Sequence, residues 1–165
     1  MTEELSYQSF FRGLNQFRID YLVVGGLAVN FHGVPRMTYD IDLMILLERS
    51  NILRLIQRLG EWGYRPKMPI DAEELADEAK REMWVGDKGM KAFTFWSDVQ
   101  PIGEVDVLID YPLSYEELKA RAEIFIVERQ RVPVISIKDL IALKVQSGRR
   151  QDLSDVEHLL MILEK

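Results

Sequence analysis

The stretch Asp40-Ile41-Asp42-Leu43-Met44-Ile45-Leu46-Leu47 places two acidic residues at the start of an apolar run. This pattern predicts a β-strand, because alternation along a strand sends Asp40 and Asp42 to one face and their apolar neighbours to the other. Two carboxylates that converge on one strand face repel each other unless a hard divalent cation binds their oxygens. The stretch therefore predicts a core strand with a magnesium site at its start.

A glycine pair, Gly25-Gly26, precedes this strand and directly follows the strand-like segment Tyr21-Leu22-Val23-Val24. Glycine lets another group approach the backbone closely, and backbone amides at the start of a helix favour phosphate. A turn that binds phosphate, followed by a short helix over 27–31, is therefore expected beside the acidic strand.

A third carboxylate is predicted on the segment 104–110, where acidic and aliphatic residues alternate. If this strand neighbours the first one, Asp40, Asp42 and Asp106 form a cluster suited to two magnesium ions in phosphoryl-type transfer. Glu104 and Asp110 lie on the same predicted face, and each remains an alternative or an addition to Asp106.

Cationic and hydroxyl side chains complete the set of candidates. The apolar stripe of the helix predicted to begin at Ser136 continues into Lys144, and a buried ammonium group needs an anionic partner. A triphosphate or the carboxylate cluster would supply that partner. Arg36 and Thr38 are the remaining candidates for contact with the nucleotide.

Composition restricts the classes of function. The chain has 165 residues, which predicts one domain over 1–165. Its net charge of −6 argues against a global field for nucleic acid, so that a polynucleotide would need a local basic patch. Zero cysteines and two histidines argue against a disulfide framework and a zinc site, so any metal should be held by oxygen.

Neither a transmembrane segment nor a signal peptide is expected. No apolar stretch approaches the roughly 18–20 residues that span a bilayer, and the N-terminal Met1-Thr2-Glu3-Glu4 is acidic. We therefore expect a cytoplasmic protein without membrane partners.

The order of patterns predicts an α+β fold with a mixed sheet of four or five strands, flanked by helices and closed by a C-terminal helical pair. Residues 65–90 are a charged surface excursion with its own helix. Gly148 is a natural stop between the last two helices, with Arg149, Asp152 and Asp155 as a capping and salt-bridge set. The strands are expected over 20–24, 40–47, 90–96, 104–109 and 124–128, and the closing helices from 136 and from about 152.

Several of these motifs together resemble those of a known family. The strings Gly25-Gly26-Leu27-Ala28, His32-Gly33, Arg36-Met37-Thr38 and Asp40-Ile41-Asp42-Leu43 resemble the DNA polymerase β-like nucleotidyltransferase superfamily. Together with the C-terminal segment 138–155, they are similar to AbiEii-type toxins and related minimal bacterial nucleotidyltransferases. The resemblance covers most of the chain and is weak across 60–100. Gly26 replaces a serine that is common in the wider superfamily.

The resemblance implies a palm-like sheet in which Asp40 and Asp42 bind Mg²⁺, with Mn²⁺ as an alternative. Asp106 would complete the site and receive the proton of the attacking hydroxyl. Binding of the triphosphate would fall to the glycine pair, with Lys144 and Arg36 neutralising its charge.

The implied function is magnesium-dependent transfer of a nucleoside monophosphate from an NTP to an acceptor hydroxyl. The acceptor would be an RNA end or a protein, within a toxin–antitoxin pair that supplies a partner chain. The alternatives are a small-molecule nucleotidyltransferase of the antibiotic-modifying kind and a catalytically silent nucleotide- or partner-binding module. An RNA acceptor predicts a basic patch from Arg65, Lys67, Lys80, Arg81, Lys88 and Lys91.

Overall fold

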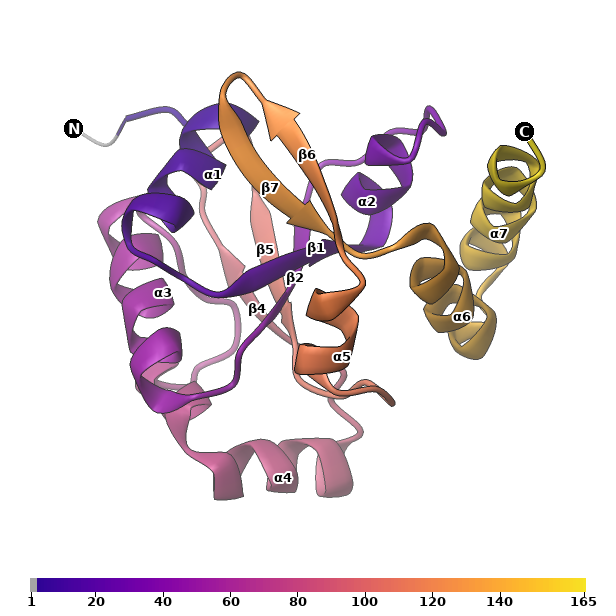
Figure 1. Cartoon of the computed structure of the whole chain (residues 1–165). Helices are drawn as coiled ribbons and strands as arrows, with labels where there is room; N and C mark the ends of the chain where they lie inside the picture. Colours follow the sequence, from indigo (N-terminus) through magenta and orange to yellow (C-terminus); the bar gives the residue numbers. More distant parts are fainter. Residues whose placement is uncertain (1–2) are drawn as a thin grey trace.

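A mixed β-sheet runs through the centre of the molecule, with helices on both of its faces (Figure 1). The computed structural model describes residues 3–165. Its strand order is β3-β4-β5-β2-β1-β7-β6. The strands are β1 (Tyr21–Val24), β2 (Ile41–Ile45), β3 (Arg65–Pro66), β4 (Ala92–Trp96), β5 (Glu104–Leu108), β6 (Glu123–Val127) and β7 (Gln130–Val134).

Most helices surround the sheet in two groups. α1 and α3 lie on one side in Figure 1, α5, α2, α6 and α7 lie on the other, and α4 lies apart from both at the lower end. The helical segments are α1 (Tyr7–Gln16), α2 (Gly25–Phe31), α3 (Arg49–Glu61), the 3₁₀ helix η1 (Ala72–Ala76), α4 (Glu78–Lys88), α5 (Tyr115–Ala120), α6 (Ile137–Ser147) and α7 (Arg150–Leu163).

The α+β class and the closing helical pair are confirmed, but the sheet has seven strands in the described residues where four or five were expected. Both strands that the sequence patterns missed contain a proline, Pro66 in β3 and Pro133 in β7. Proline lacks the amide hydrogen of a ladder and lowers any expectation of a strand. β3 is an edge strand of two residues, and β7 tolerates Pro133 at a position paired with Ile124 of β6.

Strand alternation separates an apolar face from the face that carries the predicted site. Leu43 of β2, Val107 of β5 and Phe95 of β4 are buried in the core. Their neighbours Asp42 and Asp106 point to the opposite face of the sheet. The expected alternation of acidic and apolar residues is therefore present in both β2 and β5.

The segment 65–90 is attached to the core at several points. β3 pairs with β4, Leu75 is fully buried, and the Trp84 ring of α4 packs against Phe93 with ring centroids 5.5 Å apart. The helix expected in the charged segment 65–90 is thus present as α4, and its apolar side packs against the sheet through Trp84.

The C-terminal pair forms where the caps predict it. The Ser136 hydroxyl accepts a hydrogen bond from the backbone amide of Asp139, and Gly148 ends α6 with a φ of 67°, which favours glycine. α7 begins at Arg150, two residues before the expected start. Across residues 3–165, no helix has both the length and the apolar character needed to cross a membrane.

Candidate active site

Two carboxylates face each other across neighbouring strands. β2 and β5 run parallel, and their register places Asp42 opposite Asp106. The Thr94 hydroxyl donates a hydrogen bond to Asp106 Oδ1 at 2.5 Å. Burial raises the pKa of Asp42 to about 7, and the negative charges of Asp106 and Asp40 add to this effect. The pair therefore holds more negative charge than its surroundings neutralise.

Asp40 lies just before β2, beside the same cluster. Partial burial raises its pKa, and the charges of Glu104 and Asp106 raise it further, while a hydrogen bond with the Glu104 backbone lowers it. The Glu104 side chain is held by an ion pair with Lys67. Glu104 is consequently a neighbour of the cluster whose own charge is already paired.

The three possible positions of the third carboxylate are separated by strand register. Asp106 lies opposite Asp42, whereas Asp110 follows the end of β5 and forms an ion pair with Lys91 at 2.6 Å. Asp106 is thus the acidic residue of this strand that directly meets β2, and it remains our candidate for the third site carboxylate.

Gly25 lies directly against this cluster. It follows β1, whose last residue Val24 is paired with Asp42, and its φ is 66°. A Cβ atom added at Gly25 would lie 2.1 Å from Asp42 Oδ2, so the absence of a side chain lets the carboxylate approach the turn. At Gly26, a Cβ would lie 3.0 Å from Thr38 Oγ1 and 3.3 Å from Arg36 Cζ. The predicted glycine, threonine and arginine residues therefore meet at one place.

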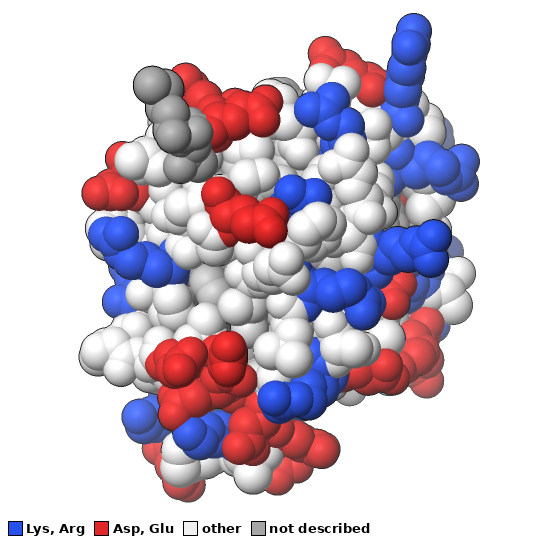
Figure 2. Space-filling model, turned by 90° about the vertical axis from the view of Figure 1, so that its left-hand side faces the viewer, with Lys and Arg blue, Asp and Glu red and all other residues white. Residues whose placement is uncertain are grey.

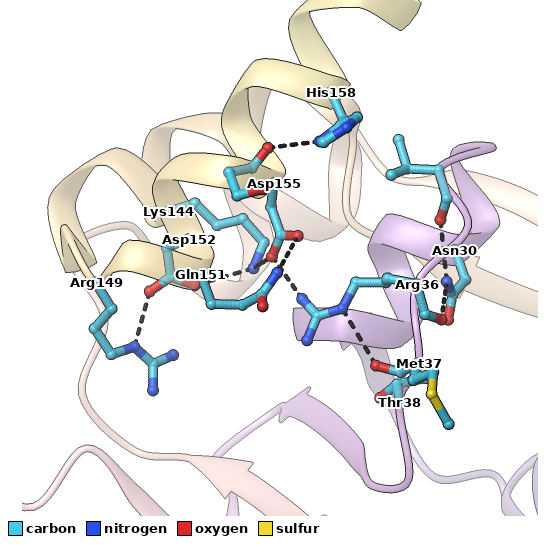
Figure 3. A network of polar contacts seen from close by, with 12 residues as sticks. Asn30, Arg36, Met37, Thr38, Lys144, Arg149, Gln151, Asp152, Asp155 and His158 are labelled. Atoms are coloured by element: carbon cyan, nitrogen blue, oxygen red, sulfur yellow. Dashed lines mark hydrogen bonds and ion pairs between the residues drawn. The ribbon is translucent and has the colours of Figure 1, made fainter.

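A second group of charges lies next to the glycine turn, where α7 meets the segment before β2 (Figure 3). Lys144 is only 7% exposed, and its Nζ lies 2.9 Å from Asp155 Oδ2 and 3.2 Å from Asp152 Oδ1. Arg36 Nη1 donates to the same Asp155 oxygen at 2.5 Å, and Arg149 Nε donates to Asp152 Oδ2 at 2.8 Å. Three cations thus share two buried carboxylates.

This network corrects one expectation about Lys144. We expected a triphosphate or the strand carboxylates as its anionic partner, but its direct partners are Asp152 and Asp155 of α7. The reason is that α6 and α7 pack against each other and bring these residues to the lysine. Lys144 still acts on the strand cluster at longer range, because its charge lowers the pKa of Asp42.

The carboxylate of Asp152 on α7 is stabilised in its ionised form. Burial alone would raise the pKa of Asp152, but hydrogen bonds from Ser147, Arg149 and Lys144 hold it down, at about 2. The expected capping and salt-bridge set around Gly148 is therefore present, and Asp155 extends it to Arg36.

The donor chemistry of the strand cluster fits a hard divalent cation. Asp42, Asp106 and Asp40 offer carboxylate oxygens, which Mg²⁺ prefers, and a bound cation would offset both the burial and the negative neighbours that raise the pKa of Asp42. Among residues 3–165, no three Asp, Glu or His side chains are grouped closely enough to hold a metal ion as they stand, so the three carboxylates would have to converge on the cation.

Two neighbours of the cluster were not among the predicted site residues. Thr94 of β4 lies opposite Asp106, and Lys67 follows β3, with its amide hydrogen-bonded to the Thr94 carbonyl. Their sequence signal is weak, because it depends on knowing that β4 pairs with β5 and that Pro66 belongs to a strand.

Half of the basic patch expected for an RNA acceptor is paired with acidic neighbours. Lys67, Lys80 and Lys91 form ion pairs with acidic neighbours, and Arg81 donates to the backbone carbonyls of Leu75 and Leu47. On the side covered by α1 and α3, Figure 2 shows blue and red side chains interspersed with white ones, and red ones gathered at the lower end.

Solved structures with the same arrangement of elements are nucleotidyltransferases. The lincosamide antibiotic adenylyltransferase LnuA in its lincomycin-bound form is 16% identical, with a TM-score of 0.61 over 97% of this chain and 99% of that chain. ANT(2")-Ia in complex with adenylyl-2"-tobramycin is 12% identical, with a TM-score of 0.61 over 94% and 86%. A putative nucleotidyltransferase from Thermotoga maritima is 13% identical, with a TM-score of 0.54 over 96% of each chain. The chain thus has a nucleotidyltransferase fold.

The sequence itself identifies the family within this class. Residues 10–163 match the family described as "Nucleotidyl transferase AbiEii toxin, Type IV TA system", and the chain belongs to this family of nucleotidyltransferases. Among curated protein sequences, none matches the chain.

Proposed function

We propose that this chain transfers a nucleoside monophosphate from an NTP to an acceptor hydroxyl with the help of Mg²⁺ or Mn²⁺. The observation that carries the proposal is the pairing of Asp42 with Asp106 directly beside the glycine turn. Carboxylates at this position lie next to a turn where two glycines let a ligand approach the backbone, which suits an anionic ligand that binds together with a cation.

The metal would be held by Asp40, Asp42 and Asp106. When bound, it would supply positive charge that neutralises phosphate oxygens and the carboxylates themselves. The protein's own contribution is to fix these oxygens on two parallel strands whose opposite faces are packed into the core, so that little movement of the carboxylates is needed.

The nucleotide phosphates would be bound by the turn and its cations. Gly25 and Gly26 leave room beside Asp42, while Arg36 and Thr38 lie over Gly26 and offer N–H and O–H donors. Lys144 adds positive charge near the turn, although it also forms an ion pair with Asp155 of α7. A guanidinium group suits phosphate recognition because its planar donors can bind two oxygens at once.

The reaction forms one bond and breaks another at the α-phosphorus. The acceptor oxygen bonds to phosphorus, the bond to the leaving pyrophosphate breaks, and the proton of the acceptor hydroxyl passes to the Asp106 carboxylate. Thr94 donates to Asp106 Oδ1, which orients the carboxyl group. Phosphoryl-type transfer needs mainly positioning and charge stabilisation from the protein, and the described groups supply both.

For the acceptor, we propose an RNA end or a protein, and the family description supports a role within a toxin–antitoxin pair. A small hydroxylated molecule is the second candidate. It is favoured by the ion pairs of Lys67, Lys80 and Lys91, which reduce the positive charge available to a long polyanion, and by the likeness in fold to antibiotic-modifying enzymes.

The test is labelling of acceptors by the purified chain. Each NTP, labelled at the α-phosphate, is incubated with Mg²⁺ and with total RNA, total protein or a set of aminoglycosides and lincosamides. Label in one of these fractions, lost in an Asp42→Ala/Asp40→Ala variant, supports the proposal and names the acceptor class. Transfer that persists without a divalent cation, or in the double variant, contradicts it.

A further inference from the structure

The two edges of the sheet differ in how well they are protected from other strands. β3 forms one edge with two residues, one of them Pro66, and the charged Lys67 follows directly. Short length, proline and lysine are common means of preventing edge-to-edge pairing. β6 forms the other edge with five residues, Glu123–Val127, and has neither proline nor lysine.

The hairpin geometry of β6 and β7 determines which backbone groups point outward. Val127 pairs with Gln130 across a two-residue turn, in which Glu128 and Arg129 both have positive φ. In such a hairpin the closing pair exchanges both hydrogen bonds, and every second pair does the same. The N–H and C=O groups of Ile124 and Ile126 therefore point away from β7, toward the open edge.

The same two residues carry exposed apolar side chains. Ile124 is 46% exposed and Ile126 is 61% exposed. The alternate residue Phe125 points to the other side and packs against Phe31, with ring centroids 5.2 Å apart. β6 thus combines unpaired backbone groups with an exposed apolar row, and its position is fixed by packing on the opposite side.

We propose that this edge binds a second copy of this chain by antiparallel pairing of β6 with β6 around a two-fold axis. Such an axis through Phe125 would place Ile124 of one copy opposite Ile126 of the other, twice. Both residues of each pair have outward backbone groups, so each pair can exchange two hydrogen bonds, and the isoleucine side chains meet as cross-strand neighbours.

Charge complementarity favours a second copy as the occupant. Glu123 lies at the start of β6 and Arg129 in the turn just beyond its end, and both are exposed. With the two-fold axis through Phe125, Glu123 of one copy lies diagonally across from Arg129 of the other, while Glu128, the other charged residue of the turn, faces Ala122. Of the other cations next to β6, Arg121 is already paired with Asp139 at 2.9 Å, and Arg131 lies on β7 opposite Ile126. The two-fold axis forms this Glu123–Arg129 pair twice, once at each end of the paired strands.

The test is sedimentation equilibrium of the full chain, with Ile126→Lys as the variant and Met161→Lys as the matched control. Met161 is 58% exposed on α7, so both variants add a lysine at an exposed apolar position. We expect the wild type and Met161→Lys to approach twice the 19.2 kDa chain mass and Ile126→Lys to remain at 19.2 kDa, with the unfolding curve that the wild type shows when diluted to a monomer. A monomeric wild type, or a dimer that survives Ile126→Lys, overturns the proposal.

A charge exchange and amide exchange test the orientation. Glu123→Arg should weaken the dimer at least tenfold, and adding Arg129→Glu should restore it. The amides of Ile124 and Ile126 should exchange slowly in the dimer and quickly on dilution, whereas the Phe125 amide stays protected by its pairing with Val132 at every concentration. A dimer in which the Ile124 and Ile126 amides exchange quickly would place the interface elsewhere and refute strand pairing.

Discussion

Replacing Gly25 by alanine tests whether nucleotide transfer needs the close approach of the Asp42 carboxylate to the glycine turn. Two physical effects combine at this position. The φ of 66° costs a residue with a Cβ about 1–2 kcal/mol, and the new Cβ would lie 2.1 Å from Asp42 Oδ2. That distance is about 1.3 Å shorter than an ordinary contact of 3.4 Å, so the carboxylate or the turn must move by roughly that amount.

The expected consequence is larger for transfer than for folding. A displacement of about 1 Å at a reacting group can lower a rate about 10²-fold, because the bound geometry is no longer productive. We therefore expect Gly25→Ala to lose transfer by about 10²-fold or more and to lose roughly 1–3 kcal/mol of unfolding free energy. Label transfer to the identified acceptor and urea unfolding measure the two effects.

Gly86→Ala is the matched control. Gly86 lies inside α4 with no atom within 4 Å of an added Cβ, so alanine should leave transfer unchanged and raise stability by up to about 1 kcal/mol. If Gly25→Ala transfers label at the wild-type rate and unfolds at the same urea concentration, the close approach of Asp42 to the turn is not needed, and the argument from Gly25 is refuted.

Three further predictions follow from the charges of the site. Asp106→Asn should lower transfer by about 10²-fold or more, whereas Asp110→Asn, beyond the end of β5, should leave the rate unchanged. Lys144→Met should lower the unfolding free energy by about 3–5 kcal/mol, because it leaves buried carboxylates with fewer cations, and urea titration measures this loss. The folded pKa of Asp152 is about 2, below its usual 3.8, so its ion pairs stabilise the fold above pH 4 and lose this effect as the pH falls from 4 to 2. Asp152→Asn should therefore be less stable than the wild type at pH 7. Melting curves measured at several pH values should show this difference shrinking between pH 4 and pH 2.

The parts of the site that depend on local spacing could be predicted from the sequence. Strand alternation alone places Asp40 and Asp42 away from the core, and the glycine pair is recognisable as a turn after a strand. The caps at Ser136 and Gly148 also depend on a few neighbouring residues, and the structure has both. Local rules were sufficient here because the interactions involved are themselves local.

The parts of the site that depend on pairing between distant segments were harder to predict from the sequence. The meeting of Asp42 with Asp106 required β2 to lie beside β5, which the sequence allowed but did not demand. The partners of Lys144 were misassigned because helix periodicity shows that the lysine is buried but not which helix packs on it. β7 was missed because Pro133 weakens its strand pattern, although its neighbours in the sheet accommodate the proline.

The central claim is that the Asp42–Asp106 pair holds a divalent cation together with an NTP. Calorimetric titration of the chain with a non-hydrolysable NTP, in the presence and absence of Mg²⁺, tests this claim most directly. The account predicts that the wild type binds the nucleotide much more tightly with Mg²⁺ than without it, and that Asp42→Asn removes this difference. Binding by Asp42→Asn that depends on Mg²⁺ as strongly as binding by the wild type would contradict it.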